Sequence, residues 1–320
     1  MSIPESIINL INDVELIMAD MIRKIRWKDG VYCPHCKSRN IIKWGRYKLF
    51  QRYKCKDCKR TFNDKTGTIF HNSKIPLFLW GCILFLFVLV HTSQRKISIL
   101  FCTSFKSIFI NCKKVMIKIF SSLPLPKGIE GEIEIDESYI TAGLKGRNNS
   151  EKIKELGRRP RKRGLKRRGR GRYQADRPPI IALILRGGYR MVFSAKRATK
   201  ATIQKIISSL QIREGSTIFT DEYTIYLFLS GIFNHQLVNH SKGEYARGEA
   251  HVNSCEGEFS IFETFIRIHR GVAKYNLPLY VSLYQLHIRV GGMNLFDGFR
   301  YVMEVILSEE PSHPTNILGK

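Results

Sequence analysis

The pattern of hydrophobic residues predicts helices in two stretches of the first 120 residues, before about residue 22 and after residue 75. Ile, Leu and Val repeat every three or four positions up to about Met21, which predicts one or two short amphipathic helices. Ser93 and Ser104 stand where the N-caps of two later helices are expected. The three helices predicted after residue 75 are 77–90, 93–101 and 104–119.

The segment Leu77–Val90 contains fourteen residues without a charge. A membrane span needs about 18 to 20 such residues, so the segment predicts a buried helix. Pro76 suits the first turn of that helix, and His91-Thr92-Ser93 ends it.

From Glu130 onward, apolar and polar residues alternate as they do in strands. The order of the predicted elements, β-β-β-α-β-α-β-α, is the order of a ribonuclease H-like domain, a mixed five-stranded sheet with helices. Gly187-Gly188 suits the tight turn between the second and third strands. The expected strands are 133–140, 179–186, 189–194, 216–220 and 236–239, and the expected helices are 199–210, 222–229, 254–269 and 277–291.

The net charge of the chain indicates what kind of partner it binds. Lys and Arg outnumber Asp and Glu by 53 to 27, which gives a formal net charge of +26 and a pI of about 9.9. Such an excess favours a polyanionic partner, most often nucleic acid, over an acidic lipid surface or a ribosome-like partner. A length of 320 residues with 43% apolar content allows two or three folded domains.

A dense basic run lies between the first two predicted strands of the α/β region. Fifteen residues, 158–172, include ten Lys or Arg, too many like charges to fold by burial. The run is either a solvated loop or localisation patch, or a segment that follows a phosphate backbone, and its place inside a strand-rich domain favours the backbone. The DNA-binding candidates are Arg158, Arg159, Arg161, Lys162, Arg163, Lys166, Arg167, Arg168, Arg170 and Arg172.

Two Cys-x-x-Cys pairs separated by eighteen residues predict a metal site near the start of the chain. Four thiolates can close a tetrahedron around one structural Zn²⁺ with no position left open for catalysis. Short strands expected at 41–43 and 48–53 complete the pattern of a zinc ribbon. The ligand candidates are Cys33, Cys36, Cys55 and Cys58.

The N-terminal segment and the four remaining cysteines indicate the redox state of the compartment. No charged and apolar secretory signal is apparent in residues 1–13, so we expect a reducing, cytoplasmic location. Cys82, Cys102, Cys112 and Cys255 are then expected to be buried thiols.

Three acidic residues occur where the predicted fold would bring them together. Asp136 lies in the first strand, Asp221 directly follows the fourth, and Glu256 begins a long helix. Neighbouring first and fourth strands would place the two aspartates face to face, with the glutamate over them. Converging carboxylates repel, and divalent hard cations, normally Mg²⁺, relieve that repulsion. Singly, each acid could also be a strand-edge acid, an N-cap or a first-turn acid.

In this order the motifs resemble those of a DDE transposase of a prokaryotic insertion sequence, in the zinc-ribbon group known as ISXO-like. The resemblance covers nearly the whole chain, and thirty-four residues separate Asp221 from Glu256, as in other DDE recombinases. The matching pieces are the two cysteine pairs and the segments 67–70, 135–139, 220–223, 238–245 and 251–257.

The resemblance implies an enzyme that binds element ends, cleaves them and joins them to target DNA. Asp136, Asp221 and Glu256 would be catalytic and would hold two Mg²⁺ ions. His251 and Asn253 would orient the glutamate, touch DNA or cap the helix. Implied partners are double-stranded DNA and a second copy of the chain, with no membrane and a nucleoid-associated, cytoplasmic location.

One position departs from the pattern of the relatives, many of which have a lysine seven residues after the glutamate. Glu263 stands there in this chain. Either Arg267 or His269 takes over that contact to DNA, or the contact is lost. Two other functions therefore stay open, an inactive or domesticated zinc-ribbon DNA-binding protein and a structure-selective nuclease.

The expected domain order follows from these segments. The limits are 1–22 for an N-terminal helical segment, 23–70 for the zinc ribbon, 71–127 for a helical region resembling a helix-turn-helix, 128–305 for the catalytic domain with its basic insert at 145–175, and 306–320 for a tail.

Overall fold

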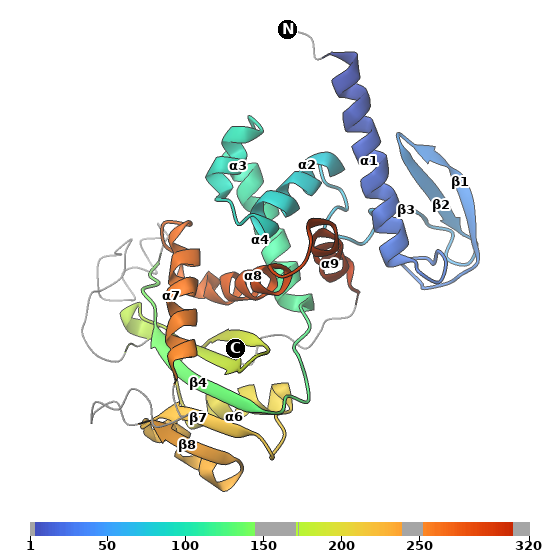
Figure 1. The fold of residues 1–320 in the computed structure, drawn as a ribbon. Helices are drawn as coiled ribbons and strands as arrows, with labels where there is room; N and C mark the ends of the chain where they lie inside the picture. The colour runs from blue at the N-terminus through green and yellow to red at the C-terminus, as the bar shows by residue number, and fades with distance from the viewer. Residues whose placement is uncertain (1–3, 145–170, 172, 239–251, 310–320) are drawn as a thin grey trace. The chain divides into compact units, whose positions relative to one another are not determined.

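The computed structural model describes residues 4–144, 171, 173–238 and 252–309 (Figure 1). These residues form two compact units. One comprises the described residues up to Ser122 together with those from Arg289 onward, and the other comprises the described residues from Leu123 to Ile288.

The second unit is built on a five-stranded mixed sheet, as predicted. Its strands follow the order β6-β5-β4-β7-β8. The pairs β4–β5 and β5–β6 are antiparallel, whereas β4–β7 and β7–β8 are parallel. The first and fourth strands are therefore neighbours, which confirms the expected α/β class. The strands are β4 (Glu132–Tyr139), β5 (Pro179–Leu185), β6 (Arg190–Ser194), β7 (Thr217–Asp221) and β8 (Asn234–Val238).

Helices pack against this sheet because β5 is apolar along its length and β4 presents Ile133 and Ile135 on one face. Helix α6 (Lys200–Leu210) contributes Ile203 and Ile206 to a core that includes Ile133 and Ile135 of β4. Helix α7 (Asn253–Arg267) packs against β4 and β5 (Figure 1). The last helix of this sheet region is α8 (Leu277–Val290).

One predicted helix of this unit is wrong in type and position. The sequence pattern suggested an α-helix at 222–229, but the chain forms the 3-10 helix η3 (Thr224–Gly231). The Asp221 side chain accepts a hydrogen bond from the Tyr223 N–H at 3.0 Å, a local turn that competes with helix formation at this point. The turn delays the helix and fixes the Asp221 carboxylate.

The helices of the first unit largely follow the apolar spacing. Ser93 and Ser104 accept hydrogen bonds from backbone N–H groups three residues later, which confirms both as N-caps. The segment predicted at 77–90 is helical, and its second half is a π-helix. The helices are α1 (Glu5–Arg26), α2 (Leu77–Ile83), η1 (Leu84–Leu89), α3 (Gln94–Leu100) and α4 (Phe105–Ser122). Among the described helices, none has the length and hydropathy that crossing a membrane requires.

A further helix, α9 (Leu295–Leu307), was not predicted. Asn294 caps it by accepting a hydrogen bond from the Asp297 N–H at 3.0 Å. Helix α9 packs against α1, α4 and η1, so it completes the core of the first unit although it comes last in the described chain. The domain limits given above remain predictions, but α1 spans the first of them and α9 joins the first unit.

The cysteine-rich segment forms a three-stranded antiparallel sheet in the order β1-β2-β3. Its strands are β1 (Ile41–Tyr47), β2 (Phe50–Cys55) and β3 (Thr61–Asn63). Arg23 of α1 binds the fully buried Asp64 through two hydrogen bonds of 3.0 and 2.9 Å. The end of α1 is therefore attached to this small sheet.

Candidate metal centres and active site

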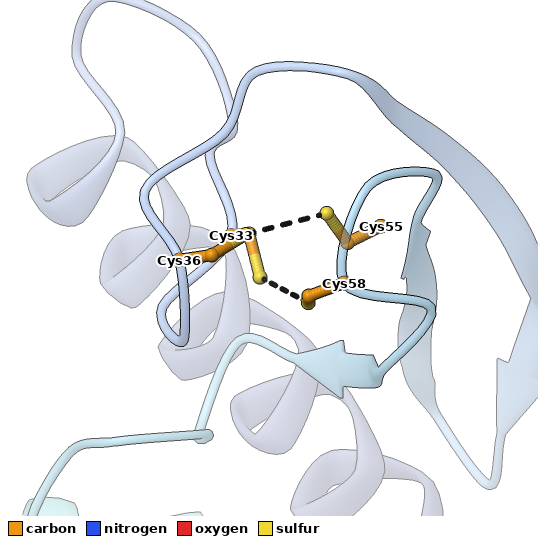
Figure 2. A group of neighbouring side chains, drawn as sticks. All are labelled: Cys33, Cys36, Cys55 and Cys58. Atoms are coloured by element: carbon orange, nitrogen blue, oxygen red, sulfur yellow. Dashed lines mark hydrogen bonds between the residues drawn. The ribbon is translucent and has the colours of Figure 1, made fainter.

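The four cysteines of the two Cys-x-x-Cys pairs converge on one point (Figure 2). Their Sγ atoms all lie within 4.8 Å of one another, with Cys33–Cys58 and Cys36–Cys55 distances of 3.6 Å. Four sulfurs at about 2.3 Å from a tetrahedral zinc would be about 3.8 Å apart. All four are free thiols, so the group matches the donor set of a structural zinc site and not a pair of disulfides.

The backbone around the two cysteine pairs favours metal binding by their thiols. The residues that follow each pair, Lys37 and Lys59, adopt a left-handed conformation with φ of 62°, which folds each loop back on itself. The N–H groups of Cys58 and Asp57 donate to the Cys55 sulfur and lower the pKa of that thiol to about 7. A lowered pKa favours the thiolate, the form that binds metal.

A small aromatic core supports the cysteine group. Trp27, at the C-terminal end of α1, packs edge-on against Tyr53 and Phe62. These three rings and the buried Cys33 and Cys55 form one hydrophobic cluster. Domains with so small an apolar core are usually stabilised by a bound metal or by disulfides.

The second candidate centre lies where β4 and β7 run side by side. The parallel register pairs Glu134 with Phe219, and its continuation by two residues places Asp136 opposite Asp221. The structure brings together Asp136, Asp221 and Glu137, and one carboxylate oxygen of each lies within 4.8 Å of the other two. Sequence reasoning anticipated the two aspartates but missed Glu137.

Like charges make this group unfavourable without a cation. The pKa of Asp136 is raised to about 8, chiefly by burial and further by the neighbouring carboxylates of Glu137, Asp221 and Glu256. The Glu137 N–H opposes this effect by donating to Asp136 Oδ1 at 2.8 Å. Converging carboxylates of this kind suit a hard divalent cation, whose charge offsets their mutual repulsion.

Glu137 is held by a hydrogen bond from η3. Tyr226 of η3 is fully buried and donates its O–H to Glu137 Oε2 at 2.7 Å. Burial raises the pKa of Tyr226 well above its ordinary value, so the hydroxyl remains a donor. The only hint of this role in the sequence was that Glu137 directly follows Asp136. Consecutive side chains of a strand normally point to opposite faces of the sheet, so the sequence did not predict that both would join one group.

Glu256 lies near this group but not within it. Its helix begins at a buried anchor, because the fully buried Glu134 accepts hydrogen bonds from both the backbone N–H and the hydroxyl of Ser254 at 3.0 Å. Arg186 pairs with the same carboxylate at 2.9 Å. The anchor fixes the start of α7 beside β4 and leaves Glu256 exposed on the first turn.

The secondary candidates divide between the two ends of α7. Asn253 is the exposed first residue of the helix, and Arg267 is its exposed last residue. Arg267 is eleven residues beyond Glu256, about 16 Å along the axis. The His269 ring lies 4.8 Å from that of Tyr280, so it takes part in packing. His251 lies outside the described residues.

The predicted basic contacts lie outside the described residues, but the chain just after them is firmly held. Lys274 is 6% exposed and donates to the Tyr173 carbonyl at 2.9 Å. The same ammonium pairs with Asp176 at 3.1 Å. These contacts attach the C-terminal end of the insert to the sheet unit.

One lysine of the helix-turn-helix-like region is hydrogen-bonded within the protein. Lys118 of α4 donates to the Ser308 carbonyl after α9. Lys106 and Lys114 are exposed on the same helix. The exposed basic side chains of α4 therefore include Lys106 and Lys114 but not Lys118.

Comparison with known proteins places these two centres in one family. Residues 128–285 match the ISXO2-like transposase domain, and residues 18–61 match the transposase zinc-ribbon domain. A relative from Halobacterium salinarum (strain ATCC 700922 / JCM 11081 / NRC-1), described as an uncharacterized protein in transposable element ISH50, is 38% identical over 292 residues. The match covers 90% of this chain and 96% of that protein. The chain therefore belongs to the ISXO2-like family of insertion-sequence transposases that carry a zinc ribbon.

Proposed function

We propose that the protein binds the ends of an insertion sequence, cleaves them in a Mg²⁺-dependent reaction and joins them to target DNA. The observation that carries the proposal is the pairing of Asp136 and Asp221 on adjacent parallel strands, with Glu137 in the same oxygen cluster. Hydrolysis leaves a 3′ hydroxyl on the element end. That hydroxyl then attacks a target phosphodiester, so one P–O bond forms as another breaks.

The protein's own groups would hold and align the reacting phosphate. Asp136, Asp221 and Glu256 would supply the oxygen ligands for two Mg²⁺ ions. When bound, such ions lower the pKa of a water and stabilise a leaving oxygen. The Tyr223 N–H keeps Asp221 in place, and no serine or tyrosine nucleophile is required. Tyr139 and Tyr223 are accordingly assigned to packing or positioning.

We assign one structural Zn²⁺ to Cys33, Cys36, Cys55 and Cys58, and a DNA-contacting role to the sheet that it supports. Residues 41–56 contain six Lys or Arg and no Asp or Glu. Trp44 and Tyr47 are 47% and 54% exposed, and the Lys54 ammonium lies 4.4 Å from the Trp44 ring. Cations and exposed rings on the strands β1 and β2 suit contact with duplex DNA.

Two other functions differ in what they require. A domesticated zinc-ribbon protein that only binds DNA would gain nothing from a group of acids near the DNA phosphates. A simple nuclease would not need to recognise the ends of an insertion sequence. Inverted repeats flanking the gene would favour the transposase over both. Assembly as a dimer on paired ends and a cytoplasmic, nucleoid-associated location belong to the same proposal.

The basic insert gives a prediction about salt. Replacing Arg158, Arg159, Arg161, Arg167 and Arg168 by Gln should weaken binding to any duplex and reduce the dependence of log K on log salt by about one unit for each lost phosphate contact. Fluorescence anisotropy at several salt concentrations, with element-end and unrelated duplexes, measures both quantities. An unchanged slope would show that the insert does not contact phosphate.

Asp136 gives a prediction about pH. The pKa of this group is about 8 in the folded protein and about 3.9 in an unfolded chain. The stabilising contribution of its bound proton is therefore complete below pH 4 and is lost as the pH rises to about 8. In Mg²⁺-free buffer, Asp136→Asn should raise the unfolding free energy by at least about 1 kcal/mol more at pH 8 than at pH 4.5. Thermal melting of both proteins across this range is the measurement, and parallel pH profiles would contradict the assignment.

A further inference from the structure

The Glu137 carboxylate lies closer to the two aspartates than the Glu256 carboxylate does. Its carboxylate belongs to the group of oxygens within 4.8 Å, and Glu256 does not. Its backbone N–H also donates to Asp136 Oδ1 at 2.8 Å. Glu137 is therefore joined to Asp136 both through the chain and through a hydrogen bond.

The orientation of Glu137 is set by the core of the sheet unit. Tyr226 donates to Glu137 Oε2 at 2.7 Å, and its ring is fully buried in the cluster that contains Ile133 and Ile218. The Tyr223 ring packs against it edge-on, with centroids 6.3 Å apart. An ionised carboxylate has about four lone-pair positions, so the hydrogen bond from Tyr226 does not by itself prevent Glu137 from binding a cation.

We propose that Glu137 is a further carboxylate ligand of the divalent cation at Asp136 and Asp221, and that Tyr226 is the residue that positions it. The inference rests on the proposed function, since it adds a ligand to the same site. Hard divalent cations take oxygen ligands, and the number of charged ligands sets their affinity. Two ligands from consecutive residues of β4 and one from β7 would hold the cation on rigid strands, independently of α7.

The competing interpretation is purely structural. Glu137 would then serve only to accept the Tyr226 hydroxyl and attach η3 to the sheet. Loss of that hydrogen bond would lower thermal stability in both interpretations. Metal affinity separates them, because a structural anchor has no effect on it once the protein is folded.

Mn²⁺ binding to the full-length, zinc-loaded protein, followed by electron paramagnetic resonance of the free ion, tests the proposal. Glu137→Gln should weaken binding about tenfold, and Tyr226→Phe, which keeps the ring, should weaken it about threefold. Glu137→Asp retains the charge on a shorter side chain and should fall between Glu137→Gln and wild type. Glu222→Gln is the matched control, since it removes one exposed charge next to Asp221 and should change affinity less than twofold. Melting curves confirm that each variant is folded.

The outcomes separate this inference from the function on which it rests. If Asp136→Asn weakens Mn²⁺ binding but Glu137→Gln and Tyr226→Phe stay within twofold of wild type, the role of Glu137 as a ligand is wrong and the site stands. If Glu222→Gln matches Glu137→Gln, the effect is general electrostatics and the role is again wrong. If Asp136→Asn has no effect, the whole cation site is overturned, and the role of Glu137 with it.

Discussion

Asp136→Asn should abolish cleavage of element ends while the protein continues to bind them. The substitution keeps the size of the side chain but removes the charge that would hold a cation beside Asp221. Loss of at least about a thousandfold in rate is expected, equivalent to ~4 kcal/mol of transition-state stabilisation. Binding of end DNA should persist or tighten, because a negative charge near the phosphates is gone. Gel-based cleavage and anisotropy on the same DNA measure the two properties.

Asp221→Asn should behave in the same way, and Glu222→Gln serves as the control. Glu222 is exposed and adjacent to Asp221, so it reports what the loss of a nearby charge does without loss of a ligand. Its cleavage rate should stay within about threefold of wild type. Asn variants at Asp136 and Asp221 that still cut ends in Mg²⁺ would show that the catalytic assignment is wrong.

Replacing Cys33 and Cys58 by serine should remove the zinc and unfold the small sheet of the first unit. Zinc-finger sites of this kind contribute an apparent ~10–16 kcal/mol of folding free energy, far more than the local aromatic core can replace. Trp27 is 5% exposed in that core, so its fluorescence should shift to the red as the core opens. Elemental analysis should fall from one zinc per chain to near zero.

Cys102→Ser is the control for that experiment. Cys102 was expected to be buried, but it is an exposed thiol of the same unit and lies outside the four-sulfur group. Zinc content and fluorescence should be unchanged in this variant. Wild-type protein purified without zinc, or a Cys33 and Cys58 double variant that retains it, would contradict the zinc assignment.

Short-range patterns account for most of what the sequence predicted correctly. Apolar alternation located the five strands of the sheet to within a few residues, because one-residue slips would expose core side chains such as Ile133. Cysteine spacing located the four-sulfur group, since two residues between thiols suit a single metal. Capping by Ser93 is likewise a local interaction.

Long-range contacts explain what the sequence did not predict. Helix α9 packs against α1, from which it is separated by most of the chain, and no local signal assigns it to that unit. Glu137 joins the acidic group because Tyr226, eighty-nine residues away, donates to it. The α7 anchor at Glu134 depends on Ser254, which is also distant in sequence. Such partners are fixed by tertiary packing and not by spacing.

The most direct test is cleavage of a labelled duplex that carries one element end and its flanking DNA. The proposed function predicts a cut at the end of the element that needs Mg²⁺, leaves a 3′ hydroxyl and is followed by joining of that end to a second duplex. If the wild type does not cut, Glu263→Lys restores the basic residue found in many relatives and is the variant to compare. Binding of the end without cutting or joining in Mg²⁺ or Mn²⁺, by the wild type and by Glu263→Lys, would contradict the account and identify a DNA-binding protein instead.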